Sequence, residues 1–241
     1  MSLKILFVES IIKTALAKSN GQPIRILDVG CGTSVYMPDL LRHQPLVTYV
    51  GVEPIEASYH EAVKNLAGLT NAAVHLQLGY DTIEGESLAS FDLVFSQSVL
   101  EHVKQLLPLL SLGEKYLAPG GTMVHRYDLG HSLTPHTLKE RFHVYMGNNL
   151  PNVLPERQFV RYVPETEVRS LYAELGLKNI RATYHQMRSH KNFEKTGVLG
   201  VDLAVRELFD WEAKHQSIFA QIPLPERELL FPAVAVWGEK K

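Results

Sequence analysis

The sequence contains a single cysteine, Cys31, among its 241 residues. One cysteine excludes an internal disulfide framework and fits a reducing compartment, so we expect a cytoplasmic protein. Long apolar runs are also missing, and no stretch approaches the ~18–20 residues that a transmembrane helix needs. The sequence therefore predicts a protein without a membrane span.

Neither sign of charge is in large excess, because 24 lysines and arginines face 26 acidic residues, for a formal net charge of -2. Proteins whose main partner is a nucleic acid usually carry a basic surface, so this balance argues against such a partner. The content of 45% hydrophobic and 21% charged residues is typical of a globular protein. The length fits one α/β domain with additions.

The first twenty residues have helical periodicity. Apolar residues recur at helical spacing from Ile5 to Leu16. Glu9 and Lys13 interrupt the apolar core that a secretory signal requires. We expect residues 1–20 to form a helix packed on the domain, with a lid over the site or a membrane-surface helix as the alternatives.

Short apolar runs alternate with helical patterns along most of the chain. The predicted strands are 24–29, 47–52, 73–78, 91–95, 122–127, 178–184 and 230–238, and the predicted helices are 38–43, 56–66, 103–116, 164–175 and 198–220. Strands separated by helices indicate right-handed βαβ units. We therefore expect an α/β, Rossmann-like, doubly wound fold, with a mostly parallel sheet of about seven strands and helices on both faces.

Residues 131–162 lack this alternation and read as irregular. Their aromatic residues, Phe142, Tyr145, Phe159 and Tyr162, predict an ordered insertion that caps the site. We expect a single domain over residues 1–241. Its parts are the N-terminal helix (1–20), a cofactor-binding core (21–130), the cap (131–162) and the C-terminal part of the sheet with its helices (163–241).

The segment ILDVGCGT at 26–33 describes a buried strand that breaks into a tight turn. Glycine suits such a turn because it adopts unusual backbone angles and lets a ligand approach the backbone closely. Glu53 follows Gly32 by twenty-one residues, at the end of the next apolar run. A carboxylate at that spacing suits the hydroxyl groups of an adenosine ribose. The pair predicts a nucleoside cofactor.

Two details distinguish between nucleoside cofactors. A dinucleotide motif has a third glycine where this chain has Val35, so that motif is incomplete. Asp28, two residues before Gly30, would repel a phosphate and would attract an ammonium or sulfonium group. These electrostatics favour S-adenosylmethionine over NAD.

Four segments then resemble the class I S-adenosylmethionine-dependent methyltransferases, and within them the small-molecule branch called type 11 or 12. They are ILDVGCGT at 26–33, VGVEP at 50–54, SFDLVFSQSVLEHV at 90–103 and YLAPGGTMV at 116–124. Their order and spacing match the family over about residues 20–130. The resemblance implies an enzyme that transfers a methyl group from S-adenosylmethionine.

The resemblance also implies which residues bind the cofactor. Asp28 and the backbone from Gly30 to Gly32 would hold the methionine end, with Cys31 contributing backbone and a small packed side chain. Glu53, followed by Pro54, would bind the ribose hydroxyls, and backbone near Ser96 would lie along the cofactor. An acidic residue for the adenine amino group is less clearly matched, because Tyr80 stands at its usual position and Asp81 follows.

Candidate catalytic residues follow the fourth and fifth strands, because ligands of such sheets bind beyond the strand carboxyl ends. They are His102, whose imidazole can accept a proton near neutral pH, and Asp128 and His131. His102 has a structural or cofactor-lining role as its alternative, and Asp128 has an ion pair with Arg126. A metal held by His125, Asp128 and His131 is disfavoured, because their spacing suits a helix and the segment reads as strand and loop.

We therefore predict methyl transfer to an oxygen or nitrogen of a small-molecule acceptor, without metal. Two rival functions remain open. One is an NAD-dependent oxidoreductase, which would need the missing third glycine. The other is a catalytically silent cofactor-binding subunit, which would keep Glu53 and transfer nothing.

Overall fold

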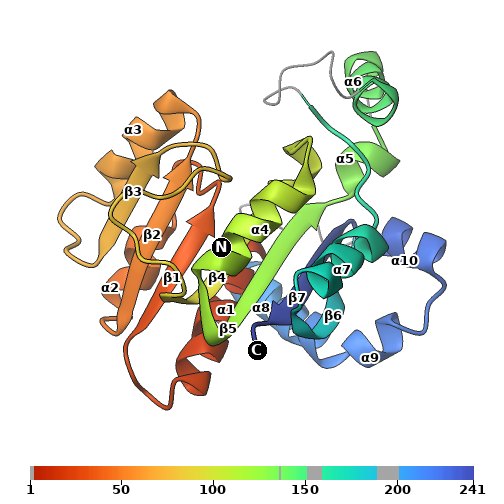
Figure 1. The fold of residues 1–241 in the computed structure, drawn as a ribbon. Coiled ribbons are helices and arrows are strands. Elements are labelled where there is room, and N and C mark those ends of the chain that lie inside the picture. The colour runs from red at the N-terminus through yellow and green to blue at the C-terminus, as the bar shows by residue number, and fades with distance from the viewer. Residues whose placement is uncertain (1–2, 136, 151–158, 189–200) are drawn as a thin grey trace.

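The computed structural model describes residues 3–135, 137–150, 159–188 and 201–241 (Figure 1). Its strands are β1 (Ile24–Val29), β2 (Val47–Glu53), β3 (Ala72–Leu76), β4 (Phe91–Gln97), β5 (Leu117–Asp128), β6 (Lys178–His185) and β7 (Ala233–Glu239). Its helices are α1 (Leu3–Lys18), α2 (Met37–Arg42), α3 (Glu56–Asn65), the 3₁₀ helix η1 (Leu100–His102), α4 (Leu106–Tyr116), α5 (Gly130–Leu133), α6 (Leu138–Asn149), α7 (Glu165–Glu174), α8 (Val201–Lys214), α9 (Gln216–Phe219) and α10 (Leu224–Leu230).

The strands form one sheet in the order β3-β2-β1-β4-β5-β7-β6. Neighbouring strands from β3 to β5 run parallel, whereas β7 runs antiparallel to both β5 and β6. The predicted Rossmann-like α/β fold with a mostly parallel, seven-stranded sheet is therefore confirmed. The parallel strands place their carboxyl ends at one edge, which is where ligands of such sheets bind.

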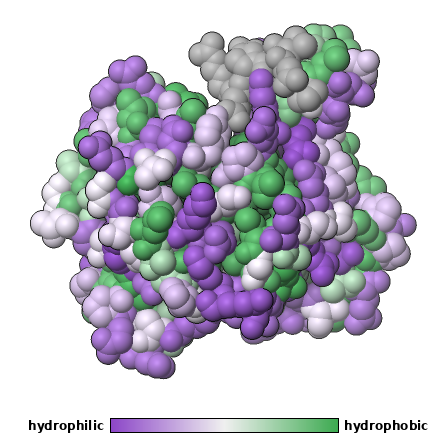
Figure 2. All heavy atoms as spheres, in the orientation of Figure 1, coloured by the Kyte–Doolittle hydropathy of each residue, from purple (hydrophilic) through white to green (hydrophobic). Residues whose placement is uncertain are grey.

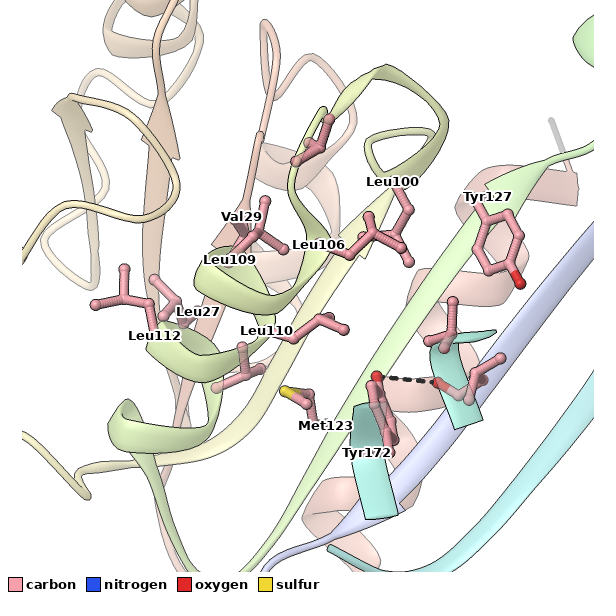
Figure 3. Packing of buried hydrophobic residues seen from close by; sticks show 14 of the residues in the cluster. Leu27, Val29, Leu100, Leu106, Leu109, Leu110, Leu112, Met123, Tyr127 and Tyr172 are labelled. Atoms are coloured by element: carbon pink, nitrogen blue, oxygen red, sulfur yellow. Dashed lines mark hydrogen bonds between the residues drawn. The ribbon is translucent and has the colours of Figure 1, made fainter. Parts of the chain in front are cut away.

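Alternating side chains of the strands build a hydrophobic core on each face of the sheet. Leu27 and Val29 of β1 pack with α4 and α7, and Figure 3 shows the leucines of α4 lying over this face. Ile24 and Ile26 of the same strand pack with α1 and α8 on the opposite face. This burial on both faces is why the strands read as nearly continuous apolar runs.

The predicted N-terminal helix is present as α1, and its apolar side chains are buried against the sheet. Its first turn also reaches the end of β4. The Gln97 side chain donates to the carbonyl of Lys4 at 3.3 Å, and the Lys4 ammonium donates to the Ser98 hydroxyl at 3.1 Å. Within the described residues, no helix is both long enough and apolar enough to cross a bilayer.

Strand β5 starts at Leu117 instead of residue 122, so it includes the proline–glycine sequence before its predicted start. Phe91 pairs with Leu117 and Leu93 pairs with Thr122, so β5 has extra residues opposite a short stretch of β4. Gly120, within this bulge of β5, has a φ of +77°. A bulge leaves the strand pairing intact on both of its sides, which is why β5 continues through a proline–glycine sequence.

The predicted cap, 131–162, contains α6 and most of α5, so the expected irregular structure is wrong for these residues, while residues 151–158 lie outside the described part. A capping box starts α6, with reciprocal hydrogen bonds of 3.1 Å between Thr137 and Glu140. Phe142 and Tyr145, expected as buried anchors, are 55% and 60% exposed, and Figure 2 shows apolar atoms on the surface over α6. Phe159 is fully buried as expected.

The C-terminal part follows the predictions with shifted boundaries. Gly176, with a φ of +78°, follows the C-cap residue of α7, where glycine commonly ends a helix. The predicted helix 198–220 is divided into α8 and α9, and residues 189–200 lie outside the described part. The last strand starts at Ala233 instead of residue 230, because α10 extends to Leu230.

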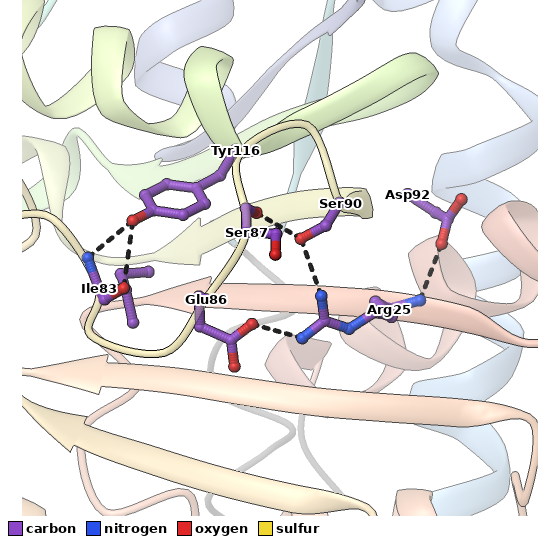
Figure 4. A network of polar contacts seen from close by, with 7 residues as sticks. All are labelled: Arg25, Ile83, Glu86, Ser87, Ser90, Asp92 and Tyr116. Carbon is purple, nitrogen blue, oxygen red and sulfur yellow. Dashed lines mark hydrogen bonds and ion pairs between the residues drawn. The ribbon is translucent and has the colours of Figure 1, made fainter.

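The polar loop between β3 and β4 is held to the core at two points (Figure 4). The Tyr116 hydroxyl accepts a hydrogen bond from the Ile83 backbone N–H at 2.8 Å. Arg25 donates to the Ser90 hydroxyl at 2.8 Å and pairs with the Glu86 carboxylate. These contacts fix a loop whose first residues border the cavity described below.

Replacing Tyr116 with phenylalanine is expected to lower the free energy of unfolding by about 1–3 kcal/mol, because the buried N–H of Ile83 loses its acceptor. Urea denaturation measures this change. Tyr145→Phe is the matched control, since Tyr145 is exposed on α6, and it should change the free energy of unfolding little. Equal effects of the two substitutions would contradict a role for the Tyr116 hydroxyl in holding the loop.

Candidate active site

A cavity of about 860 Å³ opens at the carboxyl ends of β1, β2 and β4. Residues from five segments line it, and each segment follows or faces the end of a strand. They are Val29, Gly30, Gly32, Glu53, Pro54, Ile55, Glu56, Ser58, Leu78, Gly79, Tyr80, Gln97, Ser98, Val99, His102, Val103 and Leu109. The location is the one expected for a ligand site in an open α/β sheet.

The glycine-rich turn after β1 forms one wall of the cavity. Gly30 and Gly32 have φ values of +74° and +58°, which side chains rarely allow. The N–H groups of Gly30 and Cys31 both donate to the carbonyl of Val52, at 2.8 and 3.0 Å. The turn is therefore fixed to β2, and its conformation is the one for which the sequence uses glycine.

The Glu53 carboxylate, at the end of β2, is oriented by two backbone hydrogen bonds. Gly32 N–H donates to Oε2 at 2.8 Å, and Ile55 N–H donates to Oε1 at 2.9 Å. The residue is only 4% exposed. Because a carboxylate has about four acceptor positions, lone pairs remain on both oxygens for a ligand. Glu53 is thus a preset acceptor of hydroxyl groups.

Asp28 lies behind the glycine turn and is not among the residues that line the cavity. Its Oδ2 accepts a hydrogen bond from the Tyr49 hydroxyl at 3.1 Å, and the Tyr49 hydroxyl also meets that of Ser34 at 3.0 Å. Burial, with a smaller effect of the nearby Glu53 carboxylate, raises the pKa of Asp28 to about 7. Asp28 therefore influences the site through its charge rather than through a side chain in the cavity wall.

Cys31 belongs to the glycine-rich turn but is not among the residues that line the cavity. Its side chain is buried against Gly51, where a Cβ would lie 2.7 Å from the sulfur. Burial is the main cause that raises the pKa of the thiol to about 12, and the Asp28 carboxylate adds to it. The thiol is accordingly protonated at neutral pH.

Three predicted cofactor residues have different positions in the structure. Pro54 lines the cavity beside Glu53, as expected. Ser96 is fully buried, and its hydroxyl is 2.6 Å from Nδ1 of His125, so the three residues after it line the cavity instead. Asp81 is exposed and is not among the lining residues, whereas Tyr80 is one of them.

Of the candidate catalytic residues whose side chains the structure describes, His102 is the one that lines the cavity. It ends η1, the short helix that follows β4. Its Nδ1 lies 2.9 Å from the carbonyl oxygen of Phe159, which is far away in the sequence. The preceding residue, Glu101, is buried, and its Oε1 accepts a hydrogen bond from the Asp128 backbone at 3.1 Å.

Asp128 does not reach the cavity, so its predicted contact with an acceptor is not supported by its position. Its Oδ1 accepts from the Gly130 N–H at 2.7 Å, at the start of α5, and the residue is 5% exposed. His131 lies in α5, and its side chain is outside the described part of the chain. Among the described residues, no His, Cys, Asp and Glu cluster could hold a metal ion.

Several lining residues were not predicted from the sequence. Gln97 ends β4, which extends two residues beyond its predicted end, and Ser98 and Val99 follow the strand. Ile55 and Tyr80 supply apolar and aromatic surface next to Glu53. The sequence signal that could have identified these residues is their position at or after strand ends, because such positions meet at the edge of the sheet where ligands bind.

The residues present fit S-adenosylmethionine better than a dinucleotide. The lining includes the carboxylates of Glu53 and Glu56 and contains no lysine or arginine among the described residues. An acidic lining favours a cationic sulfonium and ammonium and disfavours a pyrophosphate. Glu53 would hold the ribose, and the backbone at Gly30 and Gly32 lies where the methionine part would pass.

Comparisons with known proteins agree with this fit. The family model described as "Methyltransferase domain" matches residues 6–182. Curated relatives named tRNA U34 carboxymethyltransferase are 36% identical over 117 residues in Haemophilus ducreyi and 37% identical over 101 residues in Actinobacillus pleuropneumoniae. These matches cover 46% and 41% of this chain, and 36% and 31% of the relatives. The chain thus matches about a third of the length of these relatives.

Solved structures share the fold at low sequence identity. Phosphoethanolamine N-methyltransferase 2 of Haemonchus contortus, in complex with S-adenosyl-L-methionine, has a TM-score of 0.59 and 15% identity, over 91% of this chain and 49% of that chain. A putative sarcosine dimethylglycine methyltransferase from Galdieria sulphuraria has a TM-score of 0.61 and 16% identity, over 98% and 86%. The family match confirms S-adenosylmethionine as the cofactor and makes the NAD alternative wrong. The chain belongs to the methyltransferase domain family, as a class I S-adenosylmethionine-dependent methyltransferase.

Proposed function

We propose that this protein transfers a methyl group from S-adenosylmethionine to an oxygen or nitrogen atom of a small-molecule acceptor. The observation that carries the proposal is the cavity wall, in which Glu53 is held by two backbone N–H groups and His102 ends η1, the short helix after β4. The lining has no lysine or arginine among the described residues, so it offers little to a phosphate backbone.

Some residues of the cavity would bind the cofactor, and His102 would handle the proton of the acceptor. S-adenosylmethionine supplies a methyl group on a cationic sulfur, which is already a good leaving group. Glu53 would orient the ribose, and the Gly30–Gly32 backbone would let the methionine part pass close to β1. Val99, Val103 and Leu109 present apolar surface that excludes water, and alignment in such a site can lower the barrier by several kcal/mol, about 7–11 at best.

His102 would hydrogen-bond the acceptor or take its proton. An imidazole near neutral pH is the usual group for this task, and a positioned base contributes ~10²–10⁴-fold in rate. The His102 ring itself lines the cavity, so it can contact a bound acceptor directly. Replacement of His102 by asparagine should then lower kcat more than it weakens cofactor binding.

The experiment that tests the proposal offers labelled S-adenosylmethionine and the protein to two fractions of a cell extract. One fraction is a filtrate of small metabolites, and the other is deproteinised RNA. We expect label in a small molecule, which mass spectrometry then identifies, and loss of label with Glu53→Ala. Label in neither fraction, with cofactor binding intact by calorimetry, would instead support a catalytically silent cofactor-binding subunit.

A tRNA acceptor is the second candidate, because the curated relatives carry that acceptor in their names. In that case the RNA fraction takes up the label. Transfer into tRNA should also weaken steeply with added salt, since phosphate contacts release counterions. A transfer rate that is insensitive to salt, together with label among small metabolites, excludes this candidate.

Asp28 gives the proposed cofactor binding a characteristic pH dependence. Its pKa is raised to about 7, so the empty protein holds a proton there between about pH 4 and 7. A bound cation favours the ionised carboxylate, so binding must release this proton below pH 7. We expect the affinity for S-adenosylmethionine to rise up to about tenfold per pH unit as pH rises toward 7, and then to level off.

Calorimetry at pH 6 in buffers of different ionisation enthalpy measures the released proton. The wild type should release close to one proton, and Asp28→Asn should release none. The same carboxyl affects stability with a defined sign. Because its folded-state pKa is raised, the free energy of unfolding should fall as pH rises from about 4 to 7, and Asp28→Asn should remove that slope. Equal proton release by both proteins would contradict the assignment.

A further inference from the structure

A short segment, Phe159–Arg161, connects His102 to helix α6, and we call it the strap. On one side, the Phe159 carbonyl lies 2.9 Å from Nδ1 of His102, and the Arg161 N–H donates to the Glu101 carbonyl at 3.0 Å. The strap therefore makes hydrogen bonds to two consecutive residues of η1. Phe159 is fully buried, which fixes the strap next to the histidine.

On its other side, the strap touches the backbone of α6 at Gly147. A Cβ at Gly147 would lie 2.0 Å from the carbonyl oxygen of Val160 and 2.8 Å from its carbon. Real Cβ atoms do not approach backbone that closely, so only glycine permits this contact. The neighbouring Asn148 adds a hydrogen bond, because its Oδ1 accepts from the Tyr162 N–H at 3.0 Å. Helix α6 and the strap are thus fitted together at one glycine.

The strap also contacts helix α7. Arg161 forms a paired interaction with Glu167 of α7, with N–O distances of 3.1 and 2.8 Å. Beside this pair the strap borders a second cavity, of about 550 Å³, which Phe159, Arg161 and Gly147 help to line. The strap is therefore held by η1, α6 and α7, and the contact with α6 is the one that requires a glycine.

The bond to Phe159 determines the protonation of the His102 ring. A neutral imidazole has one N–H donor and one acceptor nitrogen, whereas a backbone carbonyl oxygen only accepts. Nδ1 must then carry the hydrogen, so that Nε2 holds the lone pair. This is the nitrogen that a base at the cavity wall would use toward an acceptor.

We propose that Gly147 is a positioning residue: by letting α6 pack on the strap, it keeps the Phe159 carbonyl on Nδ1 of His102 and thereby keeps Nε2 as the basic nitrogen. The proposal rests on the proposed function for its catalytic consequence. The predicted tautomer of the His102 ring does not depend on which acceptor the protein methylates. Helix α6 would thus act on the His102 ring through the strap.

The test substitutes Gly147 with alanine and reads the tautomer directly. Protein labelled with ¹⁵N-histidine reports by NMR which ring nitrogen carries the hydrogen, and His102→Asn identifies the signal. In the wild type we expect Nδ1–H and an unprotonated Nε2. In Gly147→Ala we expect a mixture of tautomers, because the new methyl group separates α6 and the strap. Gly68→Ala is the control for a glycine substitution without a clash: a Cβ at Gly68 would meet nothing within 4 Å, so its φ of +86° adds only local strain far from the ring.

Kinetics provide the second readout once an acceptor is available. Gly147→Ala should lower kcat by about 10²-fold, as expected for loss of a positioned base, with the cofactor Kd unchanged. A wild-type tautomer in a folded Gly147→Ala protein would overturn the proposal. If that variant does not fold, Asn148→Ala removes a single hydrogen bond and should give a smaller shift toward the other tautomer, and no shift would also overturn it. Failure of methyl transfer in every protein, with the tautomer result as expected, would instead reject the proposed function alone.

Discussion

Replacing Glu53 with alanine is expected to weaken binding of S-adenosylmethionine by about 10²-fold or more. The carboxylate accepts hydrogen bonds from Gly32 and Ile55 and, in the proposed complex, from the ribose hydroxyls. A hydrogen bond to a charged group contributes about 1.5–3 kcal/mol, and 1.4 kcal/mol corresponds to a factor of ten in Kd. Alanine removes the ribose contacts and also releases the glycine turn from β2.

Isothermal titration with S-adenosylmethionine and with S-adenosylhomocysteine measures this loss. Both ligands contain the ribose, so both affinities should fall to a similar extent. Glu61→Ala is the control, because Glu61 lies on the exposed side of α3 and its nearest cation, Lys64, is 3.9 Å away. A Glu53→Ala protein that binds as tightly as the Glu61→Ala protein would refute the role given to Glu53.

Replacing Gly30 with alanine should destabilise the protein by about 2–5 kcal/mol. Its φ of +74° is strained for any side chain, and its Cβ would lie 2.6 Å from a methyl carbon of Val99. The clash presses the glycine turn against the residues that follow β4, so we also expect weaker cofactor binding.

Two variants separate the strain from the clash in urea denaturation. Gly21→Ala has a similar φ of +79° with no atom within 4 Å, so it should show the strain alone. The double substitution Gly30→Ala with Val99→Ala removes the clashing methyl group and should recover part of the lost stability beyond what Val99→Ala alone predicts. If Gly30→Ala and Gly21→Ala cost the same, the contact with Val99 does not matter.

Much of the cofactor site could be predicted because its signals are local in sequence. Gly30 and Gly32 stand where the chain turns sharply after a strand, and Glu53 stands at the end of the next one. The backbone near Ser96 stays a predicted cofactor contact, and the neighbouring residues that line the cavity are Gln97, Ser98 and Val99. β4 extends to Gln97 instead of ending at residue 95, so the side chains that leave the sheet come slightly later than predicted.

The parts that could not be predicted depend on contacts between distant segments. No sequence pattern links His102 to Phe159, because a backbone carbonyl can belong to any residue type. Asp128 has a carboxylate that could contact an acceptor, and it lies at the end of β5. The structure nevertheless places Asp128 outside the lining of the cavity, and its Oδ1 accepts a hydrogen bond from the Gly130 N–H. A short polar side chain at a strand end serves a local cap as readily as a ligand.

The same limit explains the aromatic residues of α6. Phe142 and Tyr145 were interpreted as anchors because aromatic side chains usually bury much apolar surface. The inward side of that helix is defined instead by Gly147, whose missing side chain leaves no hydropathy signal. A contact that depends on the lack of a side chain cannot be found by searching the sequence for apolar residues.

The position of β7 in the sheet has a consequence for how the chain folds. β6 pairs with β7 alone, and β7 pairs with β5 in a register that joins Thr122 to Glu239. Neither pairing can form until residues 233–239 have reached the sheet, so this half has high contact order and should assemble slowly. Until then the outer edge of β5 offers unpaired backbone groups to other chains. Aggregation during refolding should therefore begin at β5, and chaperones would protect this edge first.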